Sequence, residues 1–159
     1  MLTFATGDMF EIDADVLVNT VNCVGVMGCG VALAFKKRYK DMFSVYRKIC
    51  KEGTLEPGGV WKYRVCSETD EKIILNLATK DHWRNASKYK YVENGLKNLR
   101  NHLLKLPPGT KVAVPALGCG HGGLFWDVVS SLIKRYLGDL DNVDIYVFSP
   151  QNSRGLDLC

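Results

Sequence analysis

Short apolar runs alternate with amphipathic stretches along most of the chain. Runs at 2–5, 16–20, 60–65, 72–78, 112–117 and 143–148 have the length and apolar character of strands. Stretches 31–39 and 42–51, and the segments after residues 87 and 127, are predicted to be helical. Strands that alternate with helices favour the α/β class, a sandwich around a mixed, largely parallel sheet.

The two later helices are the best defined. The first follows a cap at Ser87 or Asn85, and its apolar residues form one stripe: Val92, Leu96, Leu99, Leu103 and Leu106. Asp127 is expected to cap the second helix. Its apolar residues are expected to face inward: Val128, Val129, Leu132, Ile133, Tyr136 and Leu137.

The length and composition predict one globular domain. The chain has 159 residues, of which 47% are hydrophobic and 24% charged. We assign residues 1–150 to the domain and 151–159 to a polar, irregular C-terminal tail. No apolar run approaches the ~20 residues of a membrane span, and the first residues lack the features of a signal peptide. We therefore expect a cytoplasmic monomer with no membrane partner.

Two glycine-rich loops follow predicted strands. The first contains Gly25, Gly28 and Gly30, comes after Asn19 and Asn22, and leads into a helix. Such a turn binds anions through backbone N–H groups and the helix dipole. The second loop, GCGHGGL at 118–124, follows the run 112–117. Ligands bind beyond the carboxyl ends of strands in such sheets, so the loops are expected to form two walls around one phosphate-rich ligand.

Two polar residues near these loops are candidates for chemistry. Lys80 ends the strand-like IILNLATK. It is either a solvated surface group or, in the same crevice as the loops, an amine whose lowered pKa makes it a nucleophile. Asn22 either satisfies the loop backbone or hydrogen-bonds a ribose.

Three further residues also allow two interpretations. Asp8, after Gly7, either caps a turn or accepts a hydrogen bond from an adenine amino group. Phe148, at the end of the last strand, either stacks on adenine or packs in the core. His121, inside the second loop, either contacts phosphate or is exposed.

A basic and aromatic segment follows Lys80. It contains His82, Trp83, Arg84 and Lys88, a mixture that suits single-stranded nucleic acid, whose bases stack on rings while cations contact phosphates. The alternative is that the rings are core and the charges solvated. The formal net charge of +4 permits an anionic partner but does not require one. The cysteines and histidines show no metal-ligand spacing, so neither a metal nor a cofactor is expected.

Three motifs in order resemble the macrodomain family, ADP-ribose-binding modules with a three-layer α/β/α sandwich. They are Gly7-Asp8, NTVNCVGVMGCGVA and GCGHGGL. The longer strings NTVNCVGVMGCGVALAFK and NLATKDHWR are similar to the DarG branch, antitoxins paired with DarT toxins, and to the terminal ADP-ribose protein glycohydrolase branch. The resemblance implies an ADP-ribosyl glycohydrolase. Its substrate would be a modified DNA base (thymidine in single-stranded DNA for DarG) or a carboxylate ester on protein.

The resemblance also assigns roles to residues of this chain. Asp8 would hold the adenine amino group with Met9 beside it, Asn22 would orient the distal ribose, and Lys80 would act at its anomeric carbon. We therefore expect Lys80 and Asn22 to be catalytic. We expect ADP-ribose to contact Asp8, Met9, Asn19, Gly25, Val26, Met27, Gly28, Gly30, Val31, Gly118, Cys119, Gly120, His121, Gly122, Gly123, Leu124 and Phe148.

One position departs from the protein-directed branch. That branch has an aspartate in the second loop where this chain has Gly122, which favours a DNA base as the carrier of the ADP-ribose. Hydrolysis of protein esters or of O-acetyl-ADP-ribose, a non-catalytic ADP-ribose reader and a plain nucleic-acid-binding protein are the alternatives. The resemblance also implies a DarT-like toxin as a partner.

Overall fold

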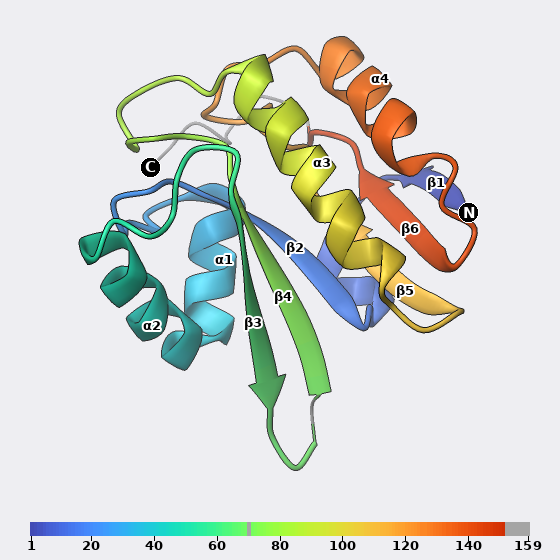
Figure 1. Cartoon of the computed structure of the whole chain (residues 1–159), viewed down its shortest axis with the longest axis horizontal. Helices are drawn as coiled ribbons and strands as arrows, with labels where there is room; N and C mark the ends of the chain where they lie inside the picture. The colour runs from blue at the N-terminus through green and yellow to red at the C-terminus, as the bar shows by residue number, and fades with distance from the viewer. Residues whose placement is uncertain (70, 152–159) are drawn as a thin grey trace.

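The computed structural model describes residues 1–69 and 71–151. Most of the predicted tail, 152–159, therefore lies outside the described residues. Figure 1 shows the elements in chain order: β1 (Leu2–Ala5), the 3-10 helix η1 (Met9–Ile12), β2 (Val16–Val21), α1 (Gly30–Arg38), α2 (Lys40–Lys51), β3 (Val60–Cys66), β4 (Glu71–Ala78), α3 (Tyr89–Leu104), β5 (Thr110–Val114), α4 (Trp126–Leu137) and β6 (Val143–Phe148).

The strands form one mixed sheet in the order β1-β6-β5-β2-β4-β3. Every neighbouring pair is parallel except β3 with β4, which is antiparallel. β2 lies between β4 and β5, so the chain crosses from one side of β2 to the other through α3. The predicted α/β class and the largely parallel, mixed sheet are confirmed.

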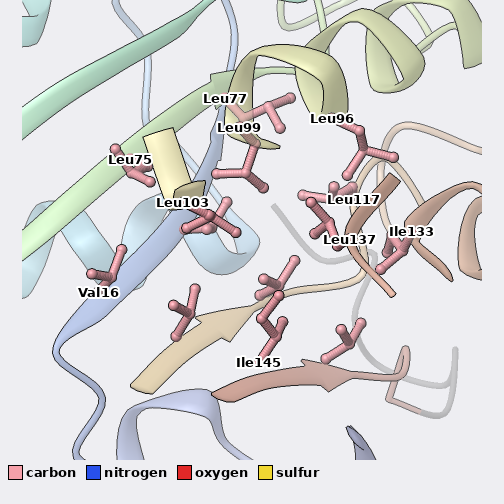
Figure 2. Close-up of a cluster of buried hydrophobic side chains, with 14 of the residues drawn as sticks. Val16, Leu75, Leu77, Leu96, Leu99, Leu103, Leu117, Ile133, Leu137 and Ile145 are labelled. Carbon is pink, nitrogen blue, oxygen red and sulfur yellow. The ribbon is translucent and has the colours of Figure 1, made fainter. Parts of the chain in front are cut away.

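Helices cover both faces of the sheet. Alternate strand residues point to opposite faces, so Val16 and Val18 pack with α3 and α4, while Leu17 packs with η1, α1 and α2. Figure 2 shows the first of these clusters, in which Leu96, Leu99 and Leu103 of α3 meet Leu75 and Leu77 of β4. The result is the expected three-layer α/β/α sandwich. Within the described part of the chain, no helix is long and apolar enough to cross a membrane.

Several predicted boundaries are wrong. The run 112–117 is a strand only to Val114, because Pro115 has no N–H for the ladder and the chain turns away. Asp127 does not cap α4, which begins at Trp126 after Phe125. Val128 is 43% exposed rather than inward-facing. Neither Ser87 nor Asn85 is the N-cap of α3, because the residue before its first turn is Lys88.

The carboxyl ends of the central strands define where a site can form. Asn22 follows β2, Thr79 and Lys80 follow β4, and Pro115 follows β5. Since these three strands are adjacent and parallel, the residues that follow them meet at one edge of the sheet.

Candidate functional site

A cleft of about 690 Å³ opens beyond the carboxyl ends of β2, β4 and β5. Segments from both glycine loops and from the ends of these strands border it. The lining residues are Thr20, Val21, Asn22, Val26, Gly28, Cys29, Gly30, Val31, Ala32, Thr79, Lys80, Trp83, Arg84, Pro115, Ala116, Gly118, Gly120, His121 and Gly122. The two predicted walls thus face one cavity.

Asn22 organises the first glycine loop. Its Nδ2 donates to the Val26 carbonyl at 2.8 Å, and its Oδ1 accepts from the backbone N–H groups of Val24 and Val26 at 3.1 and 3.3 Å. The side chain therefore does satisfy the loop backbone, as one of the two interpretations held. An amide nitrogen has two N–H donors, of which this hydrogen bond uses one, and Asn22 also lines the cleft.

Tyr46, in α2, fixes Asn22 from behind. Its hydroxyl lies 2.7 Å from the carbonyl oxygen of Asn22 and 2.9 Å from Oδ1. The side chain is fully buried, and burial raises the pKa of its hydroxyl, so the hydroxyl remains a donor. Met42, Tyr46 and Cys50 form one buried helical stripe, so the sequence pattern marks Tyr46 as core and gives no sign of its contact with the loop.

Removing this hydroxyl is expected to weaken the loop. Tyr46→Phe leaves the Asn22 carbonyl without its buried donor, which should lower the free energy of unfolding by about 1–2 kcal/mol. Urea denaturation of the two proteins measures this change. An unchanged unfolding midpoint would show that the hydroxyl does not hold the loop.

The second glycine loop is shaped by its own backbone and by Ser87. The Leu124 N–H donates to the Gly118 carbonyl at 2.9 Å, and the Ser87 N–H donates to the Gly122 carbonyl at 3.0 Å. A Cβ added at Gly122 would overlap the Gly118 carbonyl oxygen and the Ser87 hydroxyl. Only glycine therefore fits at residue 122 in this loop conformation.

Lys80 contacts both the segment that follows it and the second glycine loop. Its Nζ donates to the carbonyl of His121 at 3.2 Å and to that of Trp83 at 3.4 Å. Partial burial lowers the pKa of the amine, because taking a charge out of water disfavours the ammonium form. No carboxylate of the described residues forms an ion pair with this amine, so it has an enlarged neutral fraction for chemistry.

The segment after Lys80 forms the outer rim. Asp81 Oδ1 accepts from the His82 N–H at 2.7 Å and from Asn85 Nδ2 at 3.0 Å, which closes a tight turn. Trp83 is 46% exposed, and the Arg84 guanidinium lies over its ring, 4.7 Å from the centroid. Trp83 and Arg84 line the cleft, whereas the other two predicted nucleic-acid contacts, His82 and Lys88, do not.

Other predicted contacts lie away from the cleft lining. Asp8 caps η1 by accepting from the Phe10 N–H at 2.9 Å, and Asn19 is buried with its Nδ2 3.0 Å from Asn76 Oδ1. Met9 and Phe148 are buried in the core between the sheet and α1–α2. The predicted residues outside the lining are Asp8, Met9, Asn19, Gly25, Met27, Cys119, Gly123, Leu124 and Phe148.

The sequence prediction missed seven lining residues: Thr20, Val21, Cys29, Ala32, Thr79, Pro115 and Ala116. Thr20, Val21, Thr79, Pro115 and Ala116 lie at or just after the end of a strand, so the strand ends were the signal that could have found them. Cys29 lies between two predicted glycines, and Ala32 lies in the first turn of α1.

Two cysteines of the glycine loops, Cys23 and Cys119, lie outside the cleft lining. Burial raises the pKa of Cys23 to about 12 and that of Cys119 to about 11, so both remain protonated at neutral pH. No group of three or more His, Cys, Asp or Glu side chains suited to a metal ion gathers among residues 1–69 and 71–151.

Comparison with known proteins relates this chain to a protein family. The family model described as Macro domain matches residues 18–133. The DNA ADP-ribosyl glycohydrolase of Mycobacterium tuberculosis is 41% identical over 158 residues, which cover 99% of this chain and 45% of that protein. The chain thus spans less than half the length of this relative.

Solved structures with similar folds point to the same family. The macrodomain of Mycobacterium tuberculosis DarG superimposes with a TM-score of 0.88 and 42% identity, over 95% of this chain and 99% of that one. Thermosipho africanus DarTG in complex with ADP-ribose gives a TM-score of 0.83 and 36% identity, over 98% of this chain and 44% of that one. From the family match and these structural likenesses, the chain belongs to the macro domain family and is similar, within it, to the macrodomains of DarG proteins.

Proposed function

We propose that this protein is an ADP-ribosyl glycohydrolase that removes ADP-ribose from modified DNA bases, with ADP-ribosylated thymidine in single-stranded DNA as the preferred substrate. The observation that carries the proposal is the placement of Lys80, a partly buried amine, in one cleft with both glycine loops. The relative from Mycobacterium tuberculosis, a DNA ADP-ribosyl glycohydrolase, supports the same activity.

The cleft suits ADP-ribose because its walls offer backbone rather than bulky side chains. Gly28 and Gly30 line it from the first loop, and Gly118, Gly120 and Gly122 line it from the second. Glycines allow the diphosphate to approach backbone N–H groups closely. The likeness to a DarTG structure that contains ADP-ribose supports this ligand.

Lys80 supplies the chemistry in this proposal. The neutral amine attacks the anomeric carbon of the distal ribose, and the bond from that carbon to the base breaks. The leaving base takes the proton that the amine loses. Water then attacks the same carbon, the bond from that carbon to the Lys80 Nζ breaks, and one proton of the water passes to the amine, which releases ADP-ribose and the free lysine. The second N–H of Asn22 orients the distal ribose, which keeps the reacting carbon near the amine.

The outer rim is the part of the site suited to the DNA strand. Trp83 is 46% exposed, so its ring can take part in base stacking, and Arg84, whose guanidinium lies over that ring, supplies a charge for phosphate. Trp83→Ala is expected to weaken binding of a single-stranded oligonucleotide by about 5- to 150-fold, since stacking contributes about 1–3 kcal/mol per base. Trp83→Phe should retain most of the affinity. Fluorescence anisotropy measures both variants, and equal losses in the two would rule out stacking.

A comparison of substrates tests the proposed activity. The protein is incubated with an ADP-ribosylated single-stranded oligonucleotide, a protein carrying ester-linked ADP-ribose, and O-acetyl-ADP-ribose. We expect the highest kcat/KM on the oligonucleotide. Faster turnover of either ester would assign the protein to the ester-directed class, and binding of ADP-ribose without turnover of any substrate would make it a reader.

The chemistry also suggests a partner and a location. An enzyme that removes ADP-ribose from DNA needs a transferase that attaches it, and one similar protein from Thermosipho africanus is a fusion of a DNA ADP-ribosyl transferase with a glycohydrolase. We propose a DarT-like transferase as the partner. We also propose that this protein is a cytoplasmic monomer that acts without a metal.

A further inference from the structure

A second cavity, of about 680 Å³, lies on the other side of the first glycine loop. It is bordered by Cys23, Val24 and Gly25 of that loop and by α2. Asn22 and Val26, the loop's neighbouring residues, line the cleft instead. The segment 22–26 is therefore a wall shared by the cleft and this cavity.

The α2 side of the cavity is strongly basic. It carries Arg47, Lys48 and Lys51 together with the Ser44 hydroxyl, and all four side chains are exposed. Cys50 closes the floor, where burial raises the pKa of its thiol. The Ser44 hydroxyl donates to the Lys40 carbonyl at 3.3 Å, so the cavity presents three cations to solvent, with no carboxylate in its lining.

Positive charge is concentrated on the whole α1–α2 layer. Residues 30–52 contain seven Lys or Arg and two Asp or Glu, a net charge of +5, whereas the complete chain carries +4. The rest of the molecule is therefore net −1. Such separation of charge creates a local positive potential that attracts polyanions, even though the total charge is small.

Three of these cations lie against aromatic rings rather than carboxylates. Lys36 lies 4.4 Å from the centroid of the Phe43 ring, Arg47 lies 5.9 Å from the same ring, and Arg38 lies 4.1 Å from that of Phe10. Rings attract cations but leave the charge unpaired. No ion pair involving a Lys or Arg of α1 or α2 occurs within residues 1–69 and 71–151.

From these observations we propose that the surface formed by Arg47, Lys48 and Lys51 binds the phosphates of the nucleic-acid strand that carries the ADP-ribose. The wall shared with the cleft gives a continuous route, because a strand that presents its modified base at the cleft passes over 22–26 and reaches α2. Exposed Val24, on the cavity side, and exposed Val26, on the cleft side, offer apolar contacts to bases along this route. The identity of the strand rests on the proposed function, whereas the affinity for polyanion does not.

The test replaces the three cations and measures the affinity of unmodified single-stranded DNA of about 20 nucleotides. The variant Arg47→Gln, Lys48→Gln, Lys51→Gln keeps helix-forming side chains. We expect at least a tenfold loss of affinity at low salt. The slope of log K against log[salt] should become about 2 less negative, since each single-strand phosphate contact contributes about 0.7.

A matched variant separates the place of the charges from their number. Lys62→Gln, Arg64→Gln, Lys105→Gln removes the same charge from exposed positions on β3 and at the end of α3, and should change the affinity less than threefold. Equal losses in the two variants would overturn the proposal, as would an unchanged affinity in the α2 variant. An α2 variant that loses only binding of an acidic protein would also overturn it, in favour of a protein-docking surface.

Failure of the proposed function gives a different pattern. If the wild-type protein releases no ADP-ribose from DNA but the α2 variant still loses DNA affinity, the strand-binding surface is supported and the proposed activity is rejected. The α2 variant should bind free ADP-ribose as the wild type does, because none of its three changed residues lines the cleft. Loss of ADP-ribose binding in this variant would contradict a separate strand-binding role.

Discussion

Lys80→Met should abolish release of ADP-ribose while leaving its binding nearly intact. Methionine retains the unbranched apolar stem but has no amine to attack the anomeric carbon, so the single-turnover rate should fall at least about 100-fold. The glycine loops and Asn22 are unchanged, so the Kd for ADP-ribose from calorimetry should stay within about threefold of wild type. Lys62→Met, at an exposed position on β3, is the matched control and should retain full activity.

The pH dependence of the same reaction tests the protonation state of Lys80. Burial holds the pKa of this amine below that of an ordinary lysine. In the proposed mechanism the neutral amine is the nucleophile, so the rate should rise about tenfold per pH unit below this pKa and level off above it. The plateau should be reached at a lower pH than an exposed lysine would give. A rate that falls as the pH rises through this range would show that the ammonium form acts instead, as an acid.

Gly122→Ala should distort the second loop and lower both stability and ligand affinity. The new Cβ meets the Gly118 carbonyl oxygen, which is backbone, so the clash cannot be relieved by a side-chain rotation. Overpacking of this kind destabilises by about 1–3 kcal/mol, which corresponds to a fall in Tm of roughly 5 °C for a domain of this size. Since Gly122 lines the cleft, affinity for ADP-ribose should fall at least about tenfold.

Two further variants isolate the cause. Gly120→Ala adds a Cβ with no neighbouring atom within 4 Å, so Tm should change by less than about 1 °C. Ser87→Gly combined with Gly122→Ala removes one of the two clashing groups and should recover part of the lost stability. A Gly122→Ala protein with the Tm and affinity of wild type would show that the loop adapts readily. It would also remove the structural reason against an acidic side chain at this position.

The sequence was enough to predict the layers of the fold and the edge of the sheet at which the cleft opens. Strand and helix periodicities separate clearly in this chain, and a parallel sheet places its loops at the carboxyl ends of strands. Gly28, Gly30 and Gly118 therefore fell on the cleft, and Lys80 with them. Boundaries were less certain: the apolar character of 112–117 extends beyond the hydrogen-bonded ladder, since Leu117 is buried without being part of the strand.

What the sequence could not predict depends on contacts between distant segments. Tyr46 holds Asn22 across 24 positions of sequence, and Ser87 packs under the second loop across 35. Asn19 and Asn22 have similar sequence surroundings, yet one points into the core and the other lines the cleft. Asn19 lies within β2 and Asn22 follows it, but the hydrogen bonds that each amide makes follow only from the packed structure.

The most direct measurement of the central claim is mass spectrometry of a single-stranded oligonucleotide that carries one ADP-ribosylated thymidine, after incubation with the protein. The account predicts that the oligonucleotide loses one ADP-ribosyl group, that the thymidine base stays intact, and that one equivalent of free ADP-ribose appears. An unchanged oligonucleotide, from a protein that binds ADP-ribose and removes it from a protein ester under the same conditions, would contradict the account.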